Sequence, residues 1–292
     1  MPKMTKAFAL QIKSRKTEIF MWCWATAVGC LVACKGNPPI FPTFLISTAM
    51  LLMATSVYTY NDITDTDLDK LNQVKKDRAV PSGKITVSQA RVIVYTTGLA
   101  GMMLGLLTNL SSFLVMTLWT ALFLAYSNPQ MRLKKRLLLK EGTVGIGFFI
   151  TTIAGAMAVG SVSPSVIFAG IFFAFFVFLG FPAFRDTTDV YEDKLYGVRS
   201  LAILLSWKAK LELVFIFILA VMTLTPLTYV QFNLNVIFPI ITVASCFLVL
   251  RALFPLLSKF EEKKYTRAYK SLFGFFVVSQ AALIFATIPI VF

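Results

Sequence analysis

Long apolar stretches separated by short polar connections are the dominant pattern of this chain. They predict nine membrane-spanning helices, over residues 19–35, 41–60, 88–107, 111–127, 143–160, 164–184, 211–229, 236–257 and 271–291. Each stretch approaches the ~20 residues that, at about 1.5 Å rise per residue, cross a hydrocarbon layer of about 30 Å. The short alternating segments typical of a β-barrel are missing from the sequence. The pattern predicts an all-α, polytopic membrane protein that forms one domain over residues 1–292.

Composition and charge agree with this interpretation. Hydrophobic residues make up 57% of the chain and the mean hydropathy is +0.75, which exceeds ordinary soluble usage. The net charge is +14, and Lys and Arg gather in the N-terminal tail and in every second connection, with Lys35 as the exception. By the positive-inside rule, the N-terminus is predicted to be cytoplasmic and the C-terminus outside. The excess charge therefore indicates orientation in a cell membrane, with no nucleic acid partner.

Histidine and cysteine usage narrows the possible chemistry. The chain contains no His, and its four Cys lie within or at the ends of apolar helices without a CxxC motif. The commonest transition-metal ligand and the commonest general base are thus missing. We interpret the cysteines as small core residues. Any metal site must use oxygen ligands.

Two acidic clusters follow predicted spans and resemble each other. The first contains Asn61, Asp62, Asp65, Asp67 and Asp69, and the second repeats the spacing of its acids as Asp186, Asp189 and Asp193. Nine of the 14 acidic residues lie in these clusters and in the loop after the first one. The matching segments, 61–71 and 186–195, indicate an internal repeat whose copies meet in the bundle. Both clusters are predicted at the cytoplasmic mouth.

The spacing in each cluster points to a metal. On a helix, Asn61, Asp65 and Asp69 share one face, as do the three acids of the second cluster. Like charges on one face repel each other unless a cation neutralises them, and oxygen-only ligands suit Mg²⁺. Two opposed rows can hold a diphosphate through bridging metals. The candidate metal ligands are Asn61, Asp62, Asp65, Asp69, Asp186, Asp189 and Asp193.

An isoprenyl diphosphate fits a diphosphate site above an apolar, aromatic-rich bundle. Its leaving group would be activated by metal, with the developing charge stabilised electrostatically. The long loop after the first cluster carries Lys75, Lys76 and Arg78, and forms either a solvated ion-pair network or a lid that brings cations to phosphate. Arg15 lies in a segment, residues 1–18, that is expected to be interfacial and amphipathic, and is either a membrane anchor or a site residue.

Two helices have further distinctive compositions. The fifth predicted span is rich in Gly, at spacings that permit close contact between helices. The sixth is dense in Phe, whose side chains face lipid, pack in the bundle or line an apolar ligand site. The sixth helix leads directly into the second acidic cluster.

These motifs resemble the UbiA superfamily of intramembrane prenyltransferases. The NDxxDxxxD motif stands at 61–69 and DxxDxxxD at 186–193, with PSG at 81–83, YSxP at 126–129 and GVRS at 197–200. The resemblance implies a nine-helix bundle with a central cavity, two Mg²⁺ ions and prenyl transfer to an acceptor. It implies catalytic roles for Asp65, Asp69, Asp189, Asp193 and Tyr126. It also suggests substrate contacts by Arg78, Lys134, Lys194 and Ser127.

Within the superfamily, the compact length and the DxxDVxxD form of the second motif are most similar to archaeal geranylgeranylglyceryl phosphate geranylgeranyltransferases. The expected acceptor is such a lipid precursor or an aromatic compound. A terpene cyclase that uses the same clamp without an acceptor is the alternative. A transporter is a remote one, because transporter sites usually lie near the midplane of the membrane and these acids lie at one surface.

Overall fold

The computed structural model describes residues 3–73, 75–160 and 162–289, and every regular element in those ranges is helical. The elements are α1 (Met4–Ser14), α2 (Lys16–Ala33), α3 (Ile40–Thr64), α4 (Thr66–Asp69), η1 (Lys75–Asp77), α5 (Val87–Thr108), α6 (Leu110–Ser127), η2 (Leu133–Lys135), α7 (Leu139–Ala158), α8 (Pro164–Phe175), η3 (Phe176–Gly180), α9 (Pro182–Arg185), η4 (Asp186–Asp189), α10 (Val190–Leu195), α11 (Leu201–Leu204), α12 (Trp207–Thr228), η5 (Tyr229–Phe232), α13 (Ile237–Leu253), η6 (Phe254–Leu256) and α14 (Glu262–Thr287).

The long helices form a bundle that can cross a membrane. In the described ranges, seven helical segments are long and apolar enough to do so: α3, α5, α6, α7, α12 with η5, α13 with η6, and α14. Helix α2 and the α8–η3 segment run beside them, where the sequence predicts two further spans. The all-α membrane fold is confirmed, whereas the count of nine spans stays a prediction.

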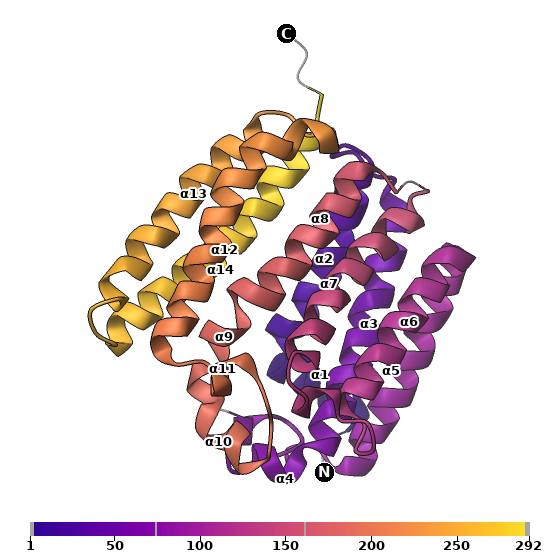
Figure 1. Ribbon diagram of the computed structural model, residues 1–292. Helices are drawn as coiled ribbons and strands as arrows, with labels where there is room; N and C mark the ends of the chain where they lie inside the picture. The colour runs from indigo at the N-terminus through magenta and orange to yellow at the C-terminus, as the bar shows by residue number, and fades with distance from the viewer. Residues whose placement is uncertain (1–2, 74, 161, 290–292) are drawn as a thin grey trace.

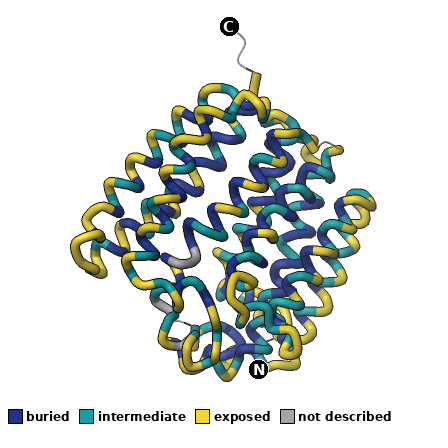
Figure 2. The backbone as a smooth tube through the Cα atoms, viewed as in Figure 1, coloured by how far each residue is buried: buried dark blue, intermediate teal, exposed yellow. Residues whose placement is uncertain are grey.

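Most of the short elements lie at one end of the bundle (Figure 1). Figure 1 shows α4, α10 and the N-terminus at this end, which we call the site end, and the C-terminus at the opposite end. Figure 2 shows that exposed positions follow the outer surface of the bundle. Many are apolar, including Leu107 and Leu118 at 71% and 59% exposure. Such an apolar exterior is suited to lipid.

Helix starts are encoded locally. Thr86 and Gln89 form a reciprocal capping box at the start of α5, in which each side chain satisfies an otherwise unpaired backbone N–H. Asn109 caps α6 by accepting a hydrogen bond from the Ser112 N–H at 2.8 Å. Ser163 caps α8, whose first residue is Pro164. These polar residues end one apolar stretch and begin the next.

Glycines bring α2 and α7 into close contact, as the sequence predicted for the fifth span. A Cβ on Gly155 would lie 2.0 Å from the Thr26 carbonyl oxygen, and one on Gly29 would lie 2.1 Å from that of Thr152. Beside this contact, the Trp22 ring packs against its aromatic neighbours Trp119, Phe123 and Phe148, at centroid distances of 4.4–5.3 Å. These contacts fix the position of helix α2 in the centre of the bundle.

Several helices extend beyond their predicted ends at the site end. The last helix begins at Glu262, so the charged connection expected to reach residue 270 is largely its first two turns. The predicted sixth span ends earlier, because α8 changes into a π-helical turn at Phe176–Gly180. Of the Phe residues in this segment, Phe173, Phe176 and Phe184 are buried in the core, whereas Phe175 is 52% exposed.

Candidate functional site

The first acidic row is interrupted in the middle. Helix α3 ends at Thr64, and Asp65 has φ −107° and ψ 7° before α4 starts at Thr66. The expectation of one regular helix from Asn61 to Asp69 is therefore wrong. A backbone hydrogen bond from the Asp69 N–H to the Asp65 carbonyl at 2.8 Å continues the turn. The break lets the row follow the mouth of the bundle.

Asp62 is fully buried and is bound by the N-terminal segment. The Arg15 guanidinium makes a bidentate ion pair with it, including an Nε–Oδ1 distance of 3.1 Å. Gln11 Nε2 donates to its Oδ2 at 2.8 Å. Arg15 is only 4% exposed, so it is a residue of the site and does not act as a membrane anchor. Asp62 thus ties α1 and the start of α2 to α3.

Asp65 and Asn61 share a lysine from another part of the chain. Lys134 Nζ pairs with Asp65 Oδ2 and lies 3.1 Å from Asn61 Oδ1. Ser127 Oγ donates to the same Asn61 oxygen at 2.9 Å. Burial lowers the pKa of Lys134, and the carboxylate of Asp65 opposes that shift. Two residues selected from the sequence, Lys134 and Ser127, therefore meet at the side-chain oxygen of Asn61.

Asp69 receives the loop that follows it. Arg78 Nη1 lies 2.8 Å from Asp69 Oδ2 and 3.9 Å from Asp62 Oδ1. Burial raises the pKa of Asp69, while Arg78 and Arg15 act to lower it. The loop is fixed by Ala79, Val80 and Ile85, whose buried side chains pack with residues of α1 and α5.

The second row begins in the short helices after the π-helical turn. Lys140 Nζ lies 2.9 Å from Asp186 Oδ2 and 2.7 Å from Asp193 Oδ2, and Arg185 Nε lies 3.0 Å from Asp186 Oδ1. Burial would by itself raise the pKa of Asp186, but Arg185 and Lys140 together lower it to about 2. The predicted site residue Asp189 has a side chain outside the described residues.

One connection joins the two rows. The segment after α6 supplies Lys134 to the first row, and the first turn of α7 supplies Lys140 to the second. Within the segment after α6, the Lys135 carbonyl accepts a hydrogen bond from the Arg199 N–H at 2.9 Å, in the GVRS segment. Neighbouring Glu141 accepts one from the Leu201 N–H at 2.8 Å. Residues 134–140 therefore contact both acidic rows at the site end.

Two other predicted residues, Tyr126 and Lys194, make no hydrogen bond or ion pair with the acids among the described residues. Tyr126 is half-buried in the last turn of α6, with its ring 6.0 Å from that of Phe123. Lys194 is exposed on α10, and no described carboxylate pairs with it. The sequence reasoning missed Lys140, although its position six residues after Lys134 offered a signal. It also missed Gln11, for which the sequence offered none.

The arrangement can hold an anion together with its metal counter-ion. Within the described residues no three acidic side chains are close enough to form a ready metal site, since cations occupy the carboxylates. Asp65 Oδ1 is nevertheless buried without a hydrogen bond, and amide and carboxylate oxygens are the donors that Mg²⁺ prefers. The acids can bind Mg²⁺ once Lys134 and Lys140 leave the carboxylates and turn toward a bound phosphate.

A bundle of this kind, with two rows of acids and their paired cations at one end, defines a membrane enzyme of the prenyltransferase class. Residues 22–279 match the model of the UbiA prenyltransferase family, and the chain belongs to this family. Digeranylgeranylglyceryl phosphate synthase of Methanosphaera stadtmanae is 27% identical over 73% of this chain and 76% of its own. 4-Hydroxybenzoate octaprenyltransferase of Psychromonas ingrahamii is 25% identical over 70% and 68%. The protein is thus a multi-pass membrane prenyltransferase.

Solved structures share its fold. A structure concerned with digeranylgeranylglyceryl phosphate synthase in membranes has a TM-score of 0.75 at 21% identity, covering 98% of this chain and 99% of the other. A UbiA homologue from Archaeoglobus fulgidus, bound to GPP and Mg²⁺, has a TM-score of 0.72 at 16% identity, covering 95% and 99%. The bundle is therefore the UbiA fold.

Proposed function

We propose that this enzyme transfers the prenyl group of an isoprenyl diphosphate to a hydroxyl of a prenylated glycerol phosphate, with geranylgeranylglyceryl phosphate as the acceptor. The observation that carries the proposal is the pair of acidic rows joined by the Lys134–Lys140 connection. The glycerol phosphate acceptor is supported by the names of relatives such as those from Methanosphaera stadtmanae and Korarchaeum cryptofilum.

The acidic rows hold divalent metal in this proposal. Asn61, Asp65 and Asp69 on one side and Asp186 and Asp193 on the other supply oxygen donors, together with Asp189 from the sequence motif. Mg²⁺ bound there would neutralise the diphosphate and make it a better leaving group. We propose two Mg²⁺ ions because the site has two acidic rows. Asp62 has a positioning role instead, since Arg15 and Gln11 bind both of its oxygens.

The basic residues change partners when substrate binds. Lys134, Lys140 and Arg78 each neutralise an acid of the rows, so a metal at those acids would release them to face the phosphate oxygens. Buried ammonium and guanidinium groups bind phosphate strongly because few waters compete. Lys194 contributes only if α10 turns toward the site.

The chemical step exchanges one C–O bond for another. The acceptor oxygen bonds to C1 of the prenyl group while the bond from C1 to the diphosphate oxygen breaks, and the proton of the acceptor hydroxyl passes to the departing diphosphate. Diphosphate leaves with the bonding electrons. Tyr126, at the end of α6, stabilises the developing allylic cation through its ring face. Ser127 holds Asn61 in place.

The site end is cytoplasmic in this proposal. The N-terminal tail, the connections that carry the acids and the α13–α14 connection share this end and hold most of the basic residues. The C-terminus then lies outside.

Product analysis tests the proposed function. Purified enzyme with Mg²⁺ is incubated with geranyl, farnesyl or geranylgeranyl diphosphate, with and without geranylgeranylglyceryl phosphate or 4-hydroxybenzoate, and products are identified by mass spectrometry. We expect a diprenylated glycerol phosphate, and loss of turnover in Asp65→Ala and Asp189→Ala variants that remain folded. A cyclic hydrocarbon formed without acceptor would identify a cyclase, and prenylated hydroxybenzoate alone would overturn the acceptor.

A further inference from the structure

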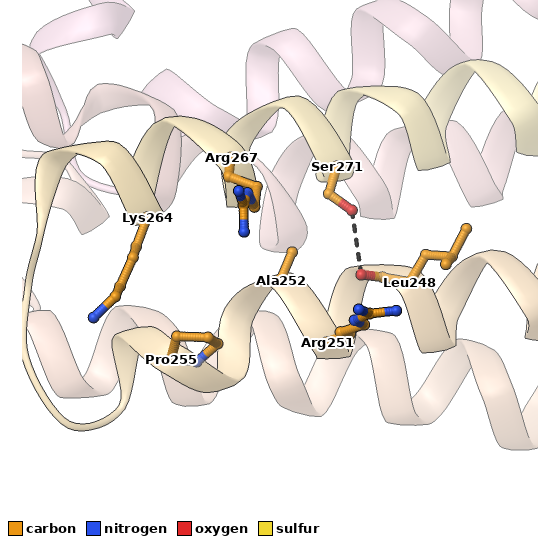
Figure 3. A pocket seen from close by; sticks show the side chains of 7 residues that line it. All are labelled: Leu248, Arg251, Ala252, Pro255, Lys264, Arg267 and Ser271. Atoms are coloured by element: carbon orange, nitrogen blue, oxygen red, sulfur yellow. Dashed lines mark hydrogen bonds between the residues drawn. The ribbon is translucent and has the colours of Figure 1, made fainter.

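A cationic cavity lies between α13 and α14, away from the acidic rows. It has a volume of about 430 Å³ and receives Arg251 from α13 and Lys264 and Arg267 from α14. Figure 3 shows these side chains on the two facing helices, with Ala252 and Pro255 between them. None of its lining residues is an acid. The cavity therefore presents positive charge from two helices to one volume.

Arg251 and Arg267 make no ion pair within the described part of the chain. Lys264 Nζ is paired with Glu261 Oε2 at 2.7 Å, whereas no described residue makes a salt bridge or side-chain hydrogen bond with Arg251 or Arg267. Both arginines are exposed. A guanidinium offers five N–H donors in a planar fork that matches phosphate oxygens. The arginines are thus available to an anion with such geometry.

The cavity combines cationic and uncharged lining residues along its length. Arg251 lies five residues before the end of η6 and Arg267 five residues after the start of α14, so each is about 7.5 Å from the end of its helix. Deeper along the helices lie Leu248, at 63% exposure, and Ser271, whose Oγ donates to the Leu248 carbonyl at 3.4 Å (Figure 3). Because Arg251 lies beside Leu248 (Figure 3), a charged headgroup held by the arginines would have an exposed apolar side chain next to it for an acyl chain.

The neighbouring surface extends this pattern. Lys263, Arg267 and Lys270 share one face of α14 and line an adjoining cavity, where Glu262 is the acidic residue. Phe247 on α13 is 58% exposed, so the apolar surface continues below the arginines. Basic pockets between transmembrane helices near the membrane surface suit anionic headgroups.

We propose that the α13–α14 cavity binds the phosphate headgroup of an anionic membrane phospholipid, with its acyl chain along Leu248 and Phe247. A water-soluble partner would leave the exposed apolar surface uncovered. The described residues of α13 and α14 contribute no acid to the two rows, so this site is separate from the prenyl transfer site and does not depend on the proposed acceptor.

Native mass spectrometry of the detergent-purified full chain tests the proposal. Dioleoylphosphatidylglycerol is titrated against the wild type, an Arg251→Gln/Arg267→Gln variant and a control, Lys6→Gln/Arg91→Gln, which loses the same charge at exposed positions outside the cavity. Each basic side chain near an anionic headgroup is worth about fivefold in affinity, so the cavity variant should bind about 30-fold more weakly. The control should bind like the wild type.

Three results would overturn the proposal. They are unchanged lipid binding by the cavity variant, an equal loss in the control, and equal retention of dioleoylphosphatidylcholine by the wild type. Displacement of the lipid by excess inorganic phosphate would likewise indicate a soluble ligand. An Arg251→Lys/Arg267→Lys variant keeps the charge and should retain most of the affinity, which separates the cationic requirement from a folding defect.

Discussion

The buried pair between Arg15 and Asp62 provides a sharp test of how the N-terminal segment is held. Arg15 is 4% exposed and Asp62 is fully buried, and Gln11 donates to the same carboxylate. Asp62→Asn keeps the shape but removes the buried carboxylate, so that the guanidinium keeps only Glu18, a 37% exposed partner whose Oε1 lies 3.2 Å from Nη1. Leaving one member of a buried pair unmatched costs about 3–5 kcal/mol of unfolding free energy. We expect a destabilisation of that size.

An exposed ion pair supplies the matched control. Lys208 and Glu212 are 3.8 Å apart, with side chains 85% and 55% exposed, so Glu212→Gln should cost less than about 1 kcal/mol. Stability is measured by unfolding in mixed micelles with increasing SDS, followed by tryptophan fluorescence. A double variant, Arg15→Gln/Asp62→Asn, should recover part of the loss because no lone charge stays buried.

Equal stability of Asp62→Asn and Glu212→Gln would refute this reasoning. It would mean that Arg15 reaches water or another anion when Asp62 is neutral. The N-terminal segment would then be only loosely attached to the site.

Three further changes have clear expected outcomes. Lys134→Met should raise KM for the prenyl diphosphate by about 30-fold or more, as expected for loss of a buried charge contact. The control variant Arg136→Met should have the steady-state kinetics of the wild type. Equal KM values for Lys134→Met and the wild type would contradict a phosphate-binding role of Lys134. Gly155→Ala should lower the free energy of unfolding by about 1–3 kcal/mol through overpacking, because the added Cβ would lie 2.0 Å from a backbone oxygen. As a control, the Cβ of Gly274→Ala meets no atom within 4 Å, and this variant should unfold at the same temperature as the wild type. Lys140→Met should bind Mn²⁺ more tightly without substrate, because the metal no longer competes with an ammonium group at Asp186; titration calorimetry showing unchanged affinity would disprove that competition.

The hydrophobic pattern predicted the helices well and their ends poorly. Hydropathy identifies the part of a helix that lies in hydrocarbon, so the apolar run starting at residue 271 was found. The charged turns from Glu262 onward are helical but carry no apolar signal, so the same pattern predicts a loop there. The same principle explains why α7 begins at Leu139, four residues before its predicted start. A helix that projects from the membrane needs no apolar residues there.

The acids of the site could be selected from spacing, but their partners could not. Asn61, Asp65 and Asp69 stood out because acids at a membrane mouth are costly and their motif is repeated. Which cation contacts which acid depends on how distant segments pack, as with Lys140 reaching Asp186 from the start of α7. The break at Asp65 and the π-helical turn at Phe176–Gly180 left no periodic signal in the sequence.

A structure of the enzyme with Mg²⁺ and a non-hydrolysable thio analogue of geranyl diphosphate tests the central claim most directly. The account predicts a diphosphate between the two rows, with metal–oxygen distances of about 2.1 Å to Asp65 on one side and Asp186 on the other. It also predicts Lys134 and Lys140 turned toward the phosphates. A diphosphate bound to one row alone, or at another surface of the bundle, would contradict it.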